Sequence, residues 1–175
     1  MKYLFETERL RVRRFEQDDA QRLFEIHSDE AVRMWIPNES YADIEEAREA
    51  IGFFAARFDE GRLPFVLAAE SKETGMLIGD TGINEVEGAS GAVEIGYVIC
   101  REHSGNGYAT ELVAAMTDFA AKAFEKNTLY GRVLHGNSAS VRVLEKNGYE
   151  FITEEYGAED DPYGNGMLIY KRECL

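Results

Sequence analysis

The residues with the clearest chemical potential form a turn that separates a β-like run from an alanine-rich stretch with helical spacing. The turn reads Ser104-Gly105-Asn106-Gly107-Tyr108-Ala109-Thr110. The first N–H groups of a helix have no intrahelical partner and lie at the positive end of its dipole, so a helix start is a favourable anion site. Glycine and alanine leave room for a phosphate to approach the main chain. The pattern favours a phosphate-bearing ligand. A turn that only links a strand to a helix is the alternative.

Two common phosphate loops are excluded by the spacing. A Walker loop requires a glycine-lysine-hydroxyl triplet, and none follows this turn. The dinucleotide fingerprint G-x-G-x-x-G places its third glycine where this chain has Thr110, and the turn lies after several strand-like runs rather than after the first. A different phosphate ligand is therefore expected.

Glu94 is the candidate general base. It lies within the apolar run Val93-Glu94-Ile95-Gly96-Tyr97-Val98-Ile99-Cys100, directly before the turn. A half-buried carboxylate has a raised pKa and can accept a proton from an amine, directly or through water. The alternative is a surface glutamate on the wet face of a strand.

Composition narrows the class of protein. The chain has 175 residues with 45% hydrophobic content, typical of a folded domain with a sizeable core, and we expect one domain over residues 1–175. The net charge of −14 argues against nucleic acid as a partner and suits a cationic substrate, although it also serves solubility. No apolar run is long enough for a membrane helix, and the N-terminus lacks a signal-peptide core. Cys100 and Cys174 have no metal-type spacing, so we expect free thiols, no metal and a cytoplasmic protein.

Periodicity predicts a mixed α/β chain with the element order β-α-α-β-β-β-α-β-α-β-β. The crossover after Cys100 makes the strands on either side of it parallel neighbours in a mixed, mostly antiparallel sheet with helices on both faces. The expected strands are 7–15, 65–70, 76–83, 92–100, 129–134, 149–152 and 167–171. The expected helices are one that follows a cap at Asp18 or Asp19 and ends near 27–29, and then 43–58, 108–124 and 140–147; residues 32–38 and 153–166 are expected to be loops.

Six short motifs in this order resemble the GNAT superfamily of N-acetyltransferases, and more narrowly its RimJ/RimL-like branch of ribosomal-protein N-terminal acetyltransferases. They cover nearly the whole chain. They are Thr-Glu-Arg-Leu-x-x-Arg at 7–13, Asp19-Ala20, Ile78-Gly79, Glu94-Ile95-Gly96-Tyr97, Gly105-x-Gly107-Tyr108-Ala109-Thr110-Glu111, and Asn137-x-x-Ser140-x-x-x-Leu144-Glu145-Lys146-x-Gly148-Tyr149.

The resemblance implies acetyl-CoA as the acetyl donor. It places the pyrophosphate on the backbone of residues 104–110, and the main chain of Tyr97, Val98 and Ile99 along the pantetheine arm, in a gap where two strands splay apart. Asn137 caps the helix after the fifth strand, and by resemblance also bonds the arm. Lys146 is a candidate partner for the outer phosphate of the cofactor.

The general acid is where this chain departs from the family. Many members carry a tyrosine at the position of Leu144, and that tyrosine gives a proton to the leaving sulfur. Ser140 is the nearest hydroxyl candidate here, and water is the alternative. This departure also favours the rival hypothesis, a non-catalytic acyl-CoA-binding or regulatory module of the same fold.

We expect an enzyme that moves an acetyl group from acetyl-CoA to a primary amine by direct attack. The amine is a protein N-terminal α-amine or a small-molecule amine. Trp35, Tyr41 and Glu94, together with the acidic loop 153–166, are expected to contact it. The sequence leaves the oligomeric state open, with a homodimer as one candidate.

Overall fold

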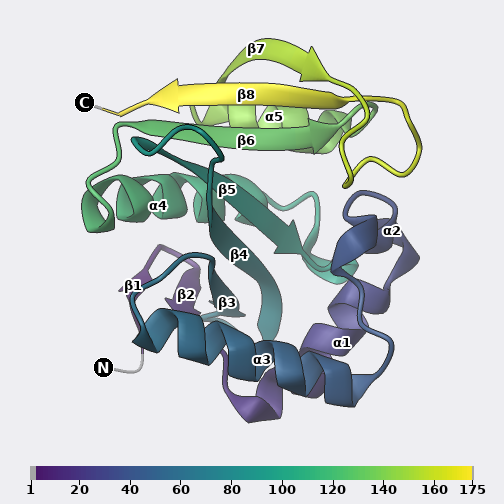
Figure 1. Ribbon diagram of the computed structural model, residues 1–175. Helices are drawn as coiled ribbons and strands as arrows, with labels where there is room; N and C mark the ends of the chain where they lie inside the picture. The colour runs from purple at the N-terminus through teal and green to yellow at the C-terminus, as the bar shows by residue number, and fades with distance from the viewer. Residues whose placement is uncertain (1–2, 175) are drawn as a thin grey trace.

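The computed structural model describes residues 3–174, which form one eight-stranded sheet with helices on both faces (Figure 1). The strand order across the sheet is β1-β2-β3-β4-β5-β6-β8-β7. In chain order the elements are β1 (Phe5–Glu6), β2 (Leu10–Arg13), η1 (Gln17–Asp19), α1 (Ala20–Ser28), α2 (Glu30–Arg33), η2 (Pro37–Glu39), α3 (Ile44–Asp59), β3 (Phe65–Ser71), β4 (Leu77–Glu85), β5 (Ala92–Ile99), η3 (Arg101–His103), α4 (Tyr108–Ala123), β6 (Thr128–Leu134), α5 (Ser138–Lys146), β7 (Glu150–Glu155) and β8 (Met167–Glu173).

The helices begin and end where their capping residues predict. The Asp43 side chain accepts a hydrogen bond from the Glu46 amide at the start of α3, and Asn137 accepts one from the Ser140 amide at the start of α5. Gly61, just beyond α3, has a φ of +66°, a left-handed conformation that favours glycine. The predicted fold class and helix positions are confirmed.

Two short elements were not predicted, and one expected boundary was wrong. The two-residue strand β1 and the single turn of helix α2 are too short for a periodic pattern to reveal. The loop expected over 153–166 begins only after Glu155, because β7 pairs with β8 through Glu155 and Met167. The charged residues at 154 and 155 read as a loop, yet an edge strand with exposed side chains tolerates them.

The two faces of the sheet carry different helices. α1 contacts β4 and α3 contacts β3, whereas α4 contacts β5 and α5 contacts β6 (Figure 1). Alternate residues of β5 therefore face different partners, because successive side chains of a strand point to opposite faces. Glu94 lies on the α1 face, in register with Asn84, and Tyr97 lies on the face covered by α4 and α5.

Strands β4 and β5 approach each other closely at Gly79. A Cβ on Gly79 of β4 would stand 2.0 Å from the carbonyl oxygen of Val98 in β5, so only glycine fits this position. Ile78 beside it is fully buried. The Ile78-Gly79 motif therefore keeps β4 in close contact with the carboxyl end of β5, at Val98 and Ile99.

No helix among residues 3–174 is both long enough and apolar enough to cross a membrane.

Candidate active site

The functional cleft lies where β5 and β6 separate. Their parallel pairing covers only Ala92–Glu94 and Thr128–Tyr130, while β5 stays paired with β4 as far as Ile99 and β6 stays paired with β8 as far as Leu134. Figure 1 shows β5 leaving β6 at an angle. A cleft of about 1120 Å³ opens in this gap, and it is large enough for a cofactor-sized ligand.

The glycine turn forms one end of the cleft. Gly105 and Gly107 have φ values of +77° and +82°, which explains why both positions carry glycine. Among the described residues, the backbone N–H groups of residues 105–110 have no hydrogen-bond partner, so six donors at the start of α4 remain available to an anion. The Ser104 N–H instead donates to the Arg101 carbonyl over 3.2 Å, so the predicted set of available amides begins one residue later.

Hydrogen bonds from Thr7 and Arg9, between β1 and β2, form a brace that holds this turn, and no pattern in the sequence predicted it. Arg9 Nη1 donates to the Asn106 carbonyl over 2.9 Å, and Arg9 Nε donates to Glu111 over 2.7 Å. The Thr7 hydroxyl and the Arg9 amide donate to the other Glu111 oxygen over 2.5 and 2.8 Å. Burial opposes ionisation of Glu111, but these hydrogen bonds lower its pKa below the ordinary range. The motif at 7–13 therefore holds the glycine turn in place. The two segments are about a hundred residues apart, so no local pattern could show that they meet.

Glu94 borders the cleft on the α1 face of the sheet. Burial raises its pKa to about 6 against the opposing charge of Arg132, and the neighbouring carboxylates of Asp160, Glu39 and Glu155 add to the increase. Within the described residues its carboxylate accepts no hydrogen bond, so it is available to a ligand. The carboxylate is therefore poised to be ionised at neutral pH and to take up a proton.

Arg132 on β6 is the positive charge that lowers the pKa of Glu94, and its guanidinium is hydrogen-bonded to other carboxylates. It donates to Asp160 over 2.8 and 3.2 Å and to Glu155 over 2.8 Å. The loop 156–166 is thereby held beside Glu94 through Asp160. The negative charge around Glu94 therefore exceeds the positive charge.

Tyr97 and Ser140 meet on the other side of β5. The two hydroxyl oxygens are 2.6 Å apart, and the Tyr97 hydroxyl also lies 3.2 Å from the Ser140 carbonyl oxygen. Burial raises the pKa of Tyr97 to about 12, so the phenol stays protonated. The sequence analysis assigned Tyr97 only a main-chain role, and the structure adds a hydroxyl pair in the cleft.

Leu144 has no part in the cleft. It is 1% exposed, and its methyl groups lie 2.9 Å from where a Cβ on Gly131 would stand. The family's tyrosine position is filled here by a core leucine under β6. Ser140, one turn earlier on α5, and its partner Tyr97 do line the cleft.

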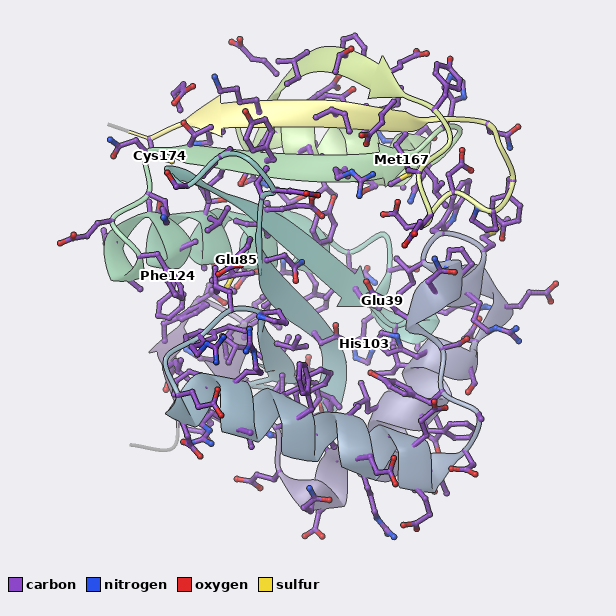
Figure 2. The ribbon with its side chains drawn as sticks, in the orientation of Figure 1. Glu39, Glu85, His103, Phe124, Met167 and Cys174 are labelled. Atoms are coloured by element: carbon purple, nitrogen blue, oxygen red, sulfur yellow. The ribbon has the colours of Figure 1, made fainter. Side chains whose placement is uncertain are left out.

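The remaining predicted residues are distributed as follows. Trp35, Tyr41, Val98, Ile99, Asn137 and Lys146 all line the cleft, and Arg142 and His103 join them. Asn106 does not line it, because its side chain turns back to the carbonyl groups of His103 and Ser104. Glu39 and His103, labelled in Figure 2, lie near the carboxyl end of β5 on the side of α2. No group of three or more His, Cys, Asp or Glu side chains suited to a metal occurs between residues 3 and 174.

The fold and the cleft define the class of protein. Residues 9–150 match the family model described as an acetyltransferase (GNAT) domain, and the chain belongs to this family of acetyltransferases. It is 30% identical to p20 of Bacillus licheniformis, named as an uncharacterized N-acetyltransferase, over 82% of this chain and 80% of that protein. It is 31% identical to YoaA of Bacillus subtilis, which carries the same description, over 84% and 82% of the two chains.

Solved structures share the fold at lower identity. The ribosomal-protein-S5-alanine acetyltransferase of Vibrio fischeri has a TM-score of 0.83 and 19% identity, with 97% and 95% of the two chains covered. A RimL ribosomal alpha-N-protein acetyltransferase in complex with coenzyme A has a TM-score of 0.85 and 15% identity, with 98% of each chain covered. The resemblance to the RimJ/RimL-like branch is therefore confirmed at the level of fold, and the protein is an acetyltransferase.

Proposed function

We propose that this protein transfers an acetyl group from acetyl-CoA to a primary amine by direct attack. The observation that carries the proposal is the gap between β5 and β6, which is open to both faces of the sheet. Glu94 borders it on the α1 face, and Tyr97 with Ser140 borders it on the α5 face. An amine can thus approach from one side while the thioester is presented from the other.

The donor end fits a nucleotide with a long arm. The available amides of residues 105–110 would hold the pyrophosphate, as the start of a helix does for other anions. The main chain of residues 97–99 would run beside the arm, and Asn137 would bond it. Lys146 and Arg142 line the cleft and are suited to the outer phosphate. The coenzyme A present in the RimL neighbour supports this assignment.

The acceptor end fits a positively charged amine. Glu39, Glu94 and Asp160 surround it, with Trp35 and Tyr41 in the same wall. Glu94 would accept the proton that the amine must lose before it can attack. An α-amino group, whose ordinary pKa is about 8, differs from Glu94 by about 2 pH units, whereas a lysine-like amine near 10.4 differs by more than 4. The smaller difference favours an α-amine, as at a protein N-terminus.

Ser140 would protonate or hydrogen-bond the departing sulfur, with Tyr97 orienting its hydroxyl. The phenol has one proton to donate; when it goes to Ser140 Oγ, 2.6 Å away, rather than to the Ser140 carbonyl at 3.2 Å, the serine proton is free to point into the cleft. A preorganised donor at the place where charge develops is an effective way to stabilise a leaving thiolate. Acetyl-CoA would supply the activated acetyl group.

The test has two stages. Isothermal titration with acetyl-CoA, with free CoA and NAD as comparisons, should show binding of both CoA species and not of NAD. Thiol release is then followed over an amine panel of alanine- and serine-initiated peptides, spermidine and an aminoglycoside. Turnover with any member supports the proposal. Absence of acetyl-CoA binding at millimolar concentration would overturn it.

The non-catalytic alternative rested on Leu144. Membership of the acetyltransferase family favours an enzyme, and the Tyr97–Ser140 pair offers a donor without a tyrosine at that position. A homodimer in the cytoplasm stays a prediction.

A further inference from the structure

A buried ion pair lies at the acceptor wall, and both of its residues line the inner end of the cleft. His27 of α1 is 3% exposed and Asp80 of β4 is 5% exposed. His27 Nε2 lies 2.7 Å from Asp80 Oδ2, and His27 Nδ1 lies 2.7 Å from the backbone carbonyl oxygen of Glu39. The imidazole therefore bridges the sheet and the short η2 segment through two close contacts.

The two partners determine the protonation of His27. A carbonyl oxygen can only accept, so Nδ1 must donate to Glu39. An ionised carboxylate also only accepts, so in the ion pair Nε2 donates to Asp80 and His27 carries both protons. Burial by itself would lower the pKa of His27, but the charges of Asp80 and Glu39 and the two hydrogen bonds raise it overall.

The same contact fixes one side of the acceptor pocket. The Glu39 carbonyl belongs to η2, and the flanking residues Trp35 and Tyr41 line the cleft. The Tyr41 ring packs 5.4 Å from the His27 ring, centroid to centroid. The Asn38 side chain donates to the Glu159 carbonyl over 3.0 Å, which joins η2 to the loop between β7 and β8. Through His27, hydrogen bonds join the Glu39 carbonyl of this wall to Asp80 of the central sheet.

We propose that His27 and Asp80 form a positioning pair that holds the acceptor wall, residues 34–42, in the geometry required for amine binding. The expected effect on amine binding rests on the proposed function, whereas the effect on the conformation of residues 34–42 does not. Neither side chain needs to touch the acceptor, because the pair acts through the Glu39 carbonyl and the Tyr41 ring.

Two substitutions distinguish the role of the hydrogen bonds that join Glu39, His27 and Asp80 from the role of the charge on the pair. In Asp80→Asn, the amide can donate to Nε2 of a neutral His27, which keeps its Nδ1–H bond to Glu39, so the wall stays anchored. In His27→Gln, both amide hydrogens leave from one nitrogen, which cannot occupy the positions of the two ring nitrogens that meet the Glu39 carbonyl and Asp80. Thr117→Val is the matched control, because it removes a buried hydrogen bond of 2.8 Å to Tyr149, which does not line the cleft.

Hydrogen exchange measured by mass spectrometry tests the wall without any acceptor. His27→Gln should raise exchange in peptides covering 34–42, whereas Asp80→Asn and Thr117→Val should leave these peptides near the wild type. With the best amine of the panel, His27→Gln should raise the acceptor KM roughly tenfold, the usual effect of one lost hydrogen bond, with kcat and the acetyl-CoA Kd within about twofold. Asp80→Asn should change KM less than about threefold.

Two results would overturn the inference. One is unchanged exchange over 34–42 and an unchanged KM in His27→Gln, with a fall in Tm like that of Thr117→Val. The other is a fall in kcat with a shifted pH profile, which would make the pair part of proton transfer. Nitrogen-15 NMR of the wild-type histidines offers a check that needs no variant: both His27 nitrogens should be protonated at pH 7. If acetyl-CoA fails to bind, the proposed function falls, while the exchange result still decides the role of the pair.

Discussion

The hydroxyl oxygens of Tyr97 and Ser140 lie 2.6 Å apart, and they join the central strand β5 to the first turn of α5 across the edge of the cleft. Tyr97 projects toward this helix because it is an odd number of residues from Glu94 along the strand. The base candidate and the acid candidate are thus placed on opposite faces by the alternation of a single strand.

Ser140→Ala should lower kcat by about 10²-fold, the lower range for loss of a general acid, with little change in acetyl-CoA affinity. Tyr97→Phe should lower kcat less, by roughly tenfold, because the serine hydroxyl stays but loses its orienting partner. The double variant should be little worse than Ser140→Ala, since the two groups act as a unit. Steady-state thiol release measures all three. Tyr149→Phe is the control, because it removes the same atom from another buried tyrosine. Near-wild-type turnover in Ser140→Ala would exclude the serine and favour water.

Glu94→Gln should reduce kcat/KM by about 10²-fold at neutral pH and recover at high pH, as the free amine supplies its own neutral form. In the wild type, activity should rise as pH increases through about 6, where the Glu94 pKa lies, because the ionised carboxylate is the active form. The variant should lack this limb of the pH profile. Glu85→Gln, at an exposed position at the end of β4 (Figure 2), is the matched control and should keep it. Identical profiles for both variants and the wild type would remove Glu94 as the base.

The same substitution should stabilise the protein. Burial raises the pKa of Glu94 from 4.5 to about 6 in the folded chain, so ionisation costs the fold free energy as pH rises through this window. A difference of this size corresponds to about 2 kcal/mol. Glu94→Gln should therefore have a larger free energy of unfolding than the wild type at pH 7.5, with the gain vanishing below about pH 4.5. Urea unfolding at the two pH values measures it, and a gain that is the same at both would contradict the assigned cause.

Gly107→Ala should weaken acetyl-CoA binding at least tenfold. The position has a φ of +82°, which strains an alanine, and a Cβ there would stand 3.4 Å from the Arg9 guanidinium that holds the turn, so the backbone amides of the turn would shift. Gly88→Ala is the control, because Gly88 has a φ of +74° in the turn between β4 and β5 and does not line the cleft. Titration calorimetry should show an affinity loss only for Gly107→Ala. An equal loss in both variants would assign the effect to general destabilisation.

Glu111→Gln should loosen the phosphate turn and lower acetyl-CoA affinity by roughly three- to tenfold, since the carboxylate accepts from Thr7, from the Arg9 amide and from the Arg9 side chain. The folded pKa of Glu111 is lowered, so its contribution to stability is present above the ordinary pKa of a glutamate and is lost as pH falls through the lower folded value. Glu45→Gln, which disturbs an exposed ion pair with Arg48, is the control for a charge change alone. Unchanged affinity in Glu111→Gln would show that the brace does not serve the donor site.

The sequence predicted best those features that depend on interactions between neighbouring residues. The glycines at positions 105 and 107 predicted a turn that opens a helix, and Asp43 and Asn137 predicted helix starts; the structure contains all three. The order of strands and helices followed from periodicity, and the motif order identified the family. Boundaries failed at β1, α2 and the end of β7, where an element is too short or too exposed to leave a pattern.

The sequence by itself determined the element order, the phosphate turn and the candidates Glu94 and Ser140, because hydrophobic periodicity, capping and glycine conformation depend on neighbouring residues. Only the tertiary structure decided which distant side chains meet. The separation of β5 from β6 beyond Glu94, the brace from Arg9 to Glu111, the Tyr97–Ser140 pair and the buried His27–Asp80 pair all join segments far apart in the chain. Their distances follow from sheet register and helix packing, which no local pattern specifies.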